Sequence, residues 1–159
     1  ERLDVVVDLH RDGARLADLD LDGLVRAYLR SIPADGATRT FFAIDRDGRF
    51  PQCILTPVLG SVDQATEMAT TLAQIDVWGY SRQDRKPGGD RAATARLATA
   101  LVAHLRAYDT DPSVPQFSSH GGRLVGITVA SGPTFRPDPE AERPRYLIEA
   151  SFHATPATT

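Results

Sequence analysis

A chain of 159 residues, of which 42% are hydrophobic and 25% charged, is long enough for one globular domain with a core of its own. The net charge of −3 leaves no overall basic surface for nucleic acid or an anionic membrane. The single Cys53 excludes an internal disulfide and a Cys-rich zinc site. No apolar run approaches membrane-spanning length, so we expect no membrane partner.

The N-terminal third predicts one helix. Apolar residues alternate with polar ones over residues 3–9, a pattern that fits a short strand or a frayed helix. Asp22 is a candidate N-cap for a helix over residues 23–31. This helix carries a stripe of four apolar side chains and ends before Pro33 and Gly36. The stripe consists of Leu24, Val25, Tyr28 and Leu29.

Three strands are expected in the middle of the chain. Residues 41–44 form the first, which the turn residues 45–48 close. Residues 53–56 form a short second strand, and an edge position is expected because Pro51 and Pro57 flank it. Residues 71–80 give the clearest pattern. Ala73, Ile75 and Val77 share one face, and Leu72, Gln74, Asp76, Trp78 and Tyr80 share the other.

The C-terminal half predicts a long helix and two strands. After a polar loop over residues 82–90, Asp90 can cap a helix over residues 91–108, with Leu97, Leu101, Leu105 and Tyr108 along one stripe. A surface loop over residues 109–120 follows. The first strand, residues 123–130, has Val125, Ile127 and Val129 on one face. The second, residues 145–153, has Tyr146, Ile148, Ala150 and Phe152 on one face.

This order of elements predicts an α+β fold, in which a mostly antiparallel β-sheet packs against a long helix, with a further N-terminal helix. We expect residues 1–19 to form an N-terminal extension or arm and residues 20–155 to form a single domain. Residues 132–144 contain four prolines and should form a protruding hairpin loop, here called the proline arm.

The sequence offers little support for catalysis, metal binding or a cofactor. Residues 18–23 match the opening of an EF-hand loop, but Leu29 stands where the bidentate glutamate should be, so helix capping explains these acids better. The four histidines lack metal-ligand spacing, and Cys53 fits a packed side chain better than a nucleophile. An enzyme would need a site assembled from scattered groups such as His104, Asp76 and Arg123. We therefore expect no catalytic, metal or cofactor site.

The informative features concern surfaces. Trp78 and Tyr80 lie on the strand face opposite Ile75, where they would meet either a partner or a second internal layer. Prolines in the arm lower the entropy lost on docking. Four side chains at the arm could contact a partner, although the arginines could instead pair with Asp138, Glu140 and Glu142 of the arm itself. These four are Phe135, Arg136, Arg143 and Arg145.

Four segments together resemble the tail terminator proteins of tailed bacteriophages, especially the short minor tail proteins of actinobacterial phages. They are TLAQIDVWGY (71–80), the helix over residues 92–108, the Gly121-Gly122 strand entry, and FRPDPE (135–140) followed by RPRYL (143–147). The resemblance covers about residues 20–154. Residues 1–19 look longer and more strand-like than the usual lead into the first helix of this family.

The resemblance implies an α+β subunit that assembles into a homo-hexameric ring on the head-proximal end of the tail tube. Such a ring ends tube polymerisation and provides the surface for the head-completion or neck protein. It also implies contact with the tail tube protein, with the tape measure protein as a further candidate, and genome DNA passing through the lumen without sequence-specific binding. The location would be the virion, and the host cytoplasm during assembly. The alternative is another neck component, a head-closure or tail-completion protein.

Overall fold

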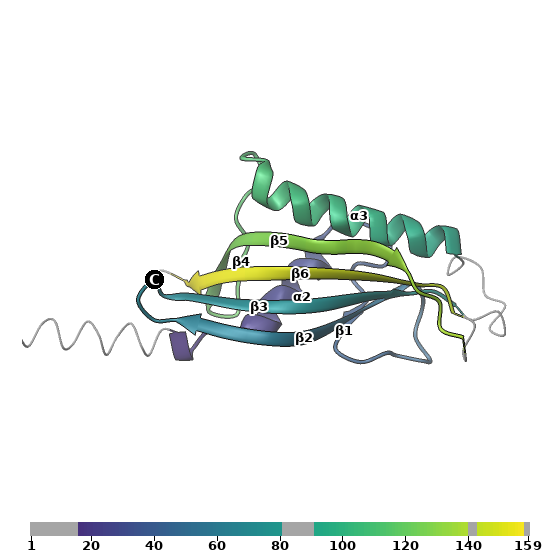
Figure 1. Cartoon of the computed structure of the whole chain (residues 1–159), viewed down its shortest axis with the longest axis horizontal. Coiled ribbons are helices and arrows are strands. Elements are labelled where there is room, and N and C mark those ends of the chain that lie inside the picture. The colour runs from purple at the N-terminus through teal and green to yellow at the C-terminus, as the bar shows by residue number, and fades with distance from the viewer. Residues whose placement is uncertain (1–15, 81–90, 140–142, 158–159) are drawn as a thin grey trace, which may run out of the picture.

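Six strands form one sheet in the order β1-β2-β3-β6-β5-β4 (Figure 1). The computed structural model describes residues 16–80, 91–139 and 143–157. Only β1 and β2 run parallel; every other neighbouring pair is antiparallel. The strands are β1 (Thr40–Phe41), β2 (Gln52–Asp63), β3 (Met68–Trp78), β4 (Ser118–Ser119), β5 (Gly122–Phe135) and β6 (Arg145–Pro156), and the two helices are α2 (Leu21–Ser31) and α3 (Arg91–Thr110).

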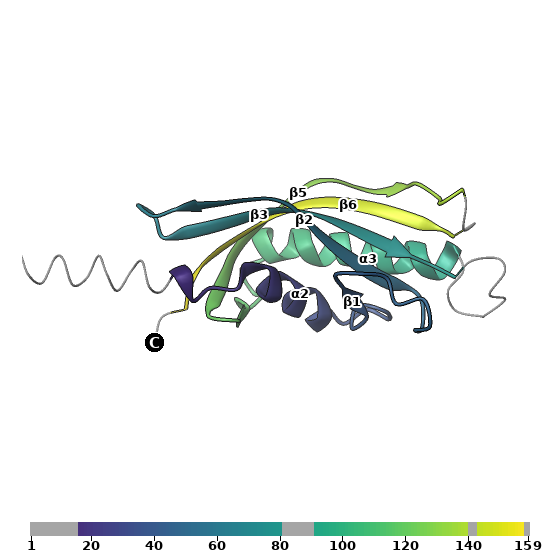
Figure 2. The ribbon, with the colours of Figure 1, turned by 90° about the horizontal axis from the view of Figure 1, so that it is seen from below.

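The predicted α+β fold, a sheet packed on a long helix, is wrong. Strands and bridges hold 43% of the described residues and helices 26%, and the sheet curls into a six-stranded half-barrel. Both helices lie inside the curve of the sheet (Figure 2). Long strands twist and coil, and bulges add bend, so four strands of 11 to 14 residues curve around the helices. The sequence patterns had suggested strands of only four to ten residues.

The core lies between the concave face of the sheet and the two helices. β3 and β6 pair over ten residues at the centre of the sheet and supply its most buried side chains. The predicted face of β3 is confirmed, since Ala73, Ile75 and Val77 are at most 1% exposed. The same holds for the inward residues of β6 and for most of the helical stripes. The fully buried members are Leu24, Val25, Leu29, Leu101, Leu105, Ile148, Ala150 and Phe152.

The predicted cap of the first helix is wrong by two residues. α2 begins at Leu21, and the Asp20 side chain, not that of Asp22, accepts a hydrogen bond of 3.0 Å from the Gly23 N–H. Asp22 lies in the first turn, where its negative charge interacts favourably with the helix dipole. Helix α3 extends to Thr110, two residues beyond the predicted end.

Two strands differ from their predicted pattern because of bulges. β2 does not stop at Pro57 but continues to Asp63, since a register shift between Pro57 and Leu59 accommodates the proline. In β5 a shift between Leu124 and Gly126 leaves Val125 without a partner. Leu124 therefore lies in the core in place of Val125, while Ile127 is buried and Val129 packs against the core, as predicted.

The remaining strand boundaries also move. β1 contains only Thr40 and Phe41, and β3 begins at Met68 and ends at Trp78, so Tyr80 lies beyond the strand. The expected strand or helix over residues 3–9, the loop over residues 82–90 with its Asp90 cap, and residues 140–142 of the proline arm lie outside the described residues.

Tyr108, at the end of α3, ties the surface loop before β4 to the sheet. Its hydroxyl donates a hydrogen bond to the Leu124 carbonyl and accepts one of 2.8 Å from the Phe117 N–H. The Tyr28 ring packs edge-on against both Tyr108 and Phe117, at 5.1 and 5.6 Å between ring centroids. Three segments that are distant in sequence therefore meet at one aromatic cluster.

Replacing Tyr108 with Phe should lower the free energy of unfolding by about 1–3 kcal/mol, because the Phe117 N–H and the Leu124 carbonyl both lose their partner. Tyr28→Phe is the matched control. The Tyr28 hydroxyl makes one long hydrogen bond of 3.4 Å to the His104 carbonyl, so we expect a smaller loss of unfolding free energy in this variant. Denaturant unfolding of both variants measures the difference, and equal losses would contradict this assignment.

Candidate interaction surfaces

The scattered groups that an enzyme would need do not meet. Asp76 pairs with Arg145 and accepts a hydrogen bond from Gln74, while His104 offers its backbone carbonyl to Tyr28. No hydrogen bond or ion pair within the described part of the chain joins any two of His104, Asp76 and Arg123. In residues 16–80, 91–139 and 143–157, no three His, Cys, Asp or Glu side chains gather where they could hold a metal ion.

Cys53 is fully buried in β2, and burial raises the pKa of its thiol to about 12. Hydrogen bonding to Thr40 and the charge of Arg39 oppose this rise but do not overcome it. The thiolate, the reactive form, is therefore scarce at neutral pH. The structure supports the interpretation of Cys53 as a packed side chain.

A thiol reagent such as dithionitrobenzoate should label Cys53 in the native protein only as fast as the protein unfolds, because the sulfur is both inaccessible and protonated. Unfolding in denaturant should make the thiol react at the rate of a free cysteine. Rapid stoichiometric labelling of the native protein would contradict the burial described above.

Four of the six predicted interface residues gather in one aromatic–arginine cluster, made of Phe50, Asp76, Trp78, Tyr80, Arg143 and Arg145. Arg145 stacks over the Trp78 ring with its Cζ 5.0 Å from the centroid, and Arg143 stacks over Phe50 at 4.5 Å. Phe50 and Tyr80 pack with ring centroids 5.1 Å apart. These contacts are all within one chain, so the cluster holds the base of the proline arm on the sheet.

The strongest polar contact of this cluster is the ion pair of Arg145 and Asp76. Arg145 Nε lies 2.7 Å from Asp76 Oδ1, and the Asp76 side chain is only 8% exposed. Arg143 adds a hydrogen bond of 3.1 Å from Nη1 to the Gly79 carbonyl, and the Gly79 N–H donates to the Pro144 carbonyl at 2.9 Å. These contacts fix the C-terminal end of the arm on the sheet.

Arg145→Met should destabilise the fold by about 3–5 kcal/mol, because it leaves the Asp76 carboxylate almost buried without its cation. The double variant Arg145→Met with Asp76→Asn should recover much of this loss, since the remaining group is neutral and still contacts Gln74. Thermal or denaturant unfolding provides the comparison. No recovery in the double variant would mean that the arginine acts through packing alone.

Phe135 and Arg136 lie at the other side of the arm. Phe135 belongs to β5 and packs between the Tyr146 ring, at 5.1 Å between centroids, and the guanidinium of Arg91, at 4.0 Å. Arg136 is exposed, and its backbone N–H donates to the Arg145 carbonyl at 2.9 Å. Within the described residues its side chain has no ion-pair partner. Arg136 is thus the predicted contact residue that is best placed to meet a partner.

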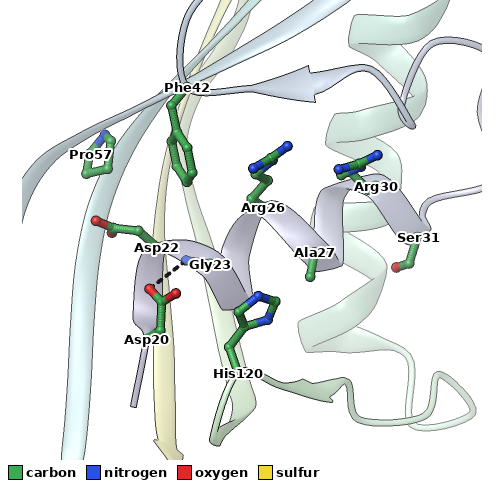
Figure 3. A pocket seen from close by; sticks show the side chains of 10 residues that line it. All are labelled: Asp20, Asp22, Gly23, Arg26, Ala27, Arg30, Ser31, Phe42, Pro57 and His120. Atoms are coloured by element: carbon green, nitrogen blue, oxygen red, sulfur yellow. Dashed lines mark hydrogen bonds between the residues drawn. The ribbon is translucent and has the colours of Figure 1, made fainter. Parts of the chain in front are cut away.

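An open groove of about 740 Å³, here the α2 groove, runs beside helix α2 (Figure 3). Asp20 and Asp22 lie at its start, and Arg26 and Arg30 follow along the helix. Arg26 is fixed by a hydrogen bond of 3.0 Å from its Nε to the Thr40 carbonyl, and its Cζ lies 5.4 Å from the centroid of the Phe42 ring. The other lining residues are Gly23, Ala27, Ser31, Phe42, Pro57 and His120.

Sequence reasoning missed the hairpin of β2 and β3. Beyond Leu55 every residue of β2 is exposed, including Val58 at 59%, Leu59 at 68% and Val62 at 61%. β1 pairs only with Cys53 and Ile54, so among the described strands the rest of β2 has a neighbour on one side alone. The apolar run from Cys53 to Val62 could have predicted a long strand. Pro57 was instead interpreted as the end of a short one.

The convex face of β3 is the second open surface. The alternative to a partner was a second internal layer, but no described helix lies over this face, since both pack inside the curve (Figure 2). Leu72 and Gln74 are half-buried there, and the Thr70 hydroxyl and His153 Nδ1 lie 3.0 Å apart. The Trp78 ring is covered by the guanidinium of Arg145 and not by a second layer of the fold.

Comparison with known proteins finds no similarity on which to base an assignment: no protein-family model matches, and no curated protein has a significantly similar sequence. In the part of the chain that the structure describes, neither helix combines the length and apolar character needed to cross a membrane. The functional argument therefore rests on the residues themselves.

Proposed function

We propose that this chain is a structural virion protein, a tail terminator of a tailed bacteriophage. Copies of the chain form a ring, a hexamer by the resemblance, that caps the head-proximal end of the tail tube. The ring ends polymerisation of the tube and provides the surface to which the head or neck attaches.

One observation carries the proposal: the exposed, apolar outer strand of the β2–β3 hairpin. An open strand edge can pair with a strand of another chain, and a closed ring removes such edges from solvent. Val58, Leu59 and Val62 add apolar surface at this edge, and monomeric proteins seldom leave such groups together in water. Both features favour a subunit of an assembly over a free enzyme.

The opposite edge of the sheet supports the same interpretation. There, β5 packs against α3; Pro133 lies in its final part, and Pro137 and Pro139 follow the strand. Prolines cannot donate to a strand ladder, so this edge resists pairing. The two edges of this sheet are therefore unlike: the β2 edge can pair with another strand, whereas the proline-bearing edge cannot.

The partners follow from the proposed role. They are further copies of this chain, the tail tube protein and the head-completion or neck protein, with the tape measure protein as an additional candidate. DNA would pass through the lumen without being read. The protein would act in the host cytoplasm during assembly and remain in the virion.

Deletion of the gene from the parent phage or prophage tests the function by electron microscopy of the lysate. We expect overlong tubes without heads, because nothing stops polymerisation. Tails of normal length that fail to join heads would instead indicate a head-closure or tail-completion protein. Intact infectious particles would contradict a structural role.

Leu59→Lys together with Val62→Lys should abolish ring assembly and leave the monomer folded, because charged side chains on an edge strand prevent pairing with another strand. Thr128→Lys is the control, since Thr128 is exposed in β5, away from this edge. Analytical ultracentrifugation measures assembly, and circular dichroism checks the fold. Rings of normal stability in the double variant would show that the hairpin is not a subunit contact.

A further inference from the structure

The charges along the α2 groove are separated by sign. Asp20 and Asp22 lie together at the first turn, whereas Arg26 and Arg30 occupy the second and third turns. Within the described residues, Asp22 and Arg30 are exposed and neither has an ion-pair partner. Burial, and then repulsion from the Asp20 carboxylate, raise the pKa of Asp22. The start of the groove therefore carries negative charge that no cation of the described residues neutralises.

One backbone edge of the proline arm is already hydrogen-bonded within the chain, and the other lacks the N–H groups for a β-ladder. The N–H groups of Arg136 and Asp138 donate inward to the Arg145 and Arg143 carbonyls, at 2.9 and 3.2 Å. The alternate positions, which face outward, are Pro137 and Pro139 and carry no N–H. Residues 136–139 of the arm therefore donate no backbone hydrogen bond outward, which leaves recognition to side chains and carbonyl acceptors, and the prolines reduce the entropy lost on docking.

The spacing of charges on the arm matches that on the groove. Arg136 and Asp138 are two residues apart on an extended segment, so they project to the same side at a spacing of about 6.6 Å. Asp22 and Arg26 are one helical turn apart, about 6 Å along the axis of α2. Along the chain, the arm presents a cation and then an anion, whereas helix α2 presents an anion and then a cation, so the two pairs are complementary.

The two surfaces cannot meet within one molecule as the chain is folded. The arm is hydrogen-bonded to Arg143 and Arg145 at the end of its own sheet, and the aromatic–arginine cluster fixes that end. The α2 groove is formed by the N-terminal helix together with Phe42 and Pro57. An arm that enters this groove therefore belongs to another copy of the chain.

We infer that residues 136–139 of the proline arm of one subunit dock in the α2 groove of the next, with Arg136 beside Asp22 and Asp138 beside Arg26. Phe42, which is 45% exposed, and Pro57 then provide an apolar wall for the proline rings of the arm. Because two different surfaces meet, the contact is head-to-tail, the geometry that closes into a ring when the rotation allows. This inference rests on the proposed function, since it requires neighbouring copies in a ring.

A charge swap tests the contact. Arg136→Glu alone and Asp22→Arg alone should each weaken self-association at least tenfold in ultracentrifugation, because each places like charges together. The double variant should recover to within a few-fold of the wild-type chain, because the pair is restored with reversed sign. Asp22→Arg combined with Arg106→Glu is the matched control and should not recover, since Arg106 lies on α3. Circular dichroism and thermal unfolding confirm that each variant is folded.

Complementation of the deletion with the same variants separates this inference from the proposed function. Overlong tails with either single variant and tails of normal length with the double variant support the docking. Single variants that associate and cap normally would overturn the docking while the terminator function stands. A folded double variant that behaves like the singles would also overturn it. A deletion without a tail phenotype would overturn the terminator function, and ultracentrifugation would then be the test of the docking. If the wild-type chain also stays monomeric there, the docking is overturned as well.

Discussion

The pairing of β3 with β6 is the constraint on which the rest of the structure depends. The ten-residue register places Ala73, Ile75 and Val77 beside Ile148 and Ala150 on one concave face, and the two helices pack there. A shift by one residue would turn this set outward and expose the whole core. The same register brings Arg145 opposite Trp78, so that the aromatic–arginine cluster forms at the base of the proline arm.

From this central pair the sheet grows outward to two unlike edges. On one side β2 extends beyond its short partner β1, so that its apolar residues Val58, Leu59 and Val62 lie on a strand whose outer edge is open. On the other side β5 is backed by α3 and ends in a segment whose outward positions are prolines. The proposed ring requires two different surfaces on each subunit, and the two edges of this sheet differ. The charged α2 groove lies beside the open edge, because Pro57 of β2 is one of its lining residues.

The sequence predicted local structure well and the architecture poorly. Period-two burial in β3 and β6 and the helical stripes were visible because the hydrophobic pattern alone sets them. Sheet curvature was not, because it arises from strand length and from bulges at Pro57 and Val125, which break the pattern that reveals a strand. For the candidate site, the sequence suggested residues but could not show which contacts they make within the chain. Whether an arginine such as Arg145 faces a partner or its own Asp76 depends on pairing between strands 69 residues apart.

The central claim is that copies of this chain form the ring at the head-proximal end of a phage tail tube. Cryo-electron microscopy of the neck of complete virions tests it most directly. The account predicts a closed ring of this half-barrel subunit, seated on the last ring of the tube, with β2–β3 hairpins buried between neighbours. A neck without this chain, or single copies whose β2 edge remains in solvent, would contradict it.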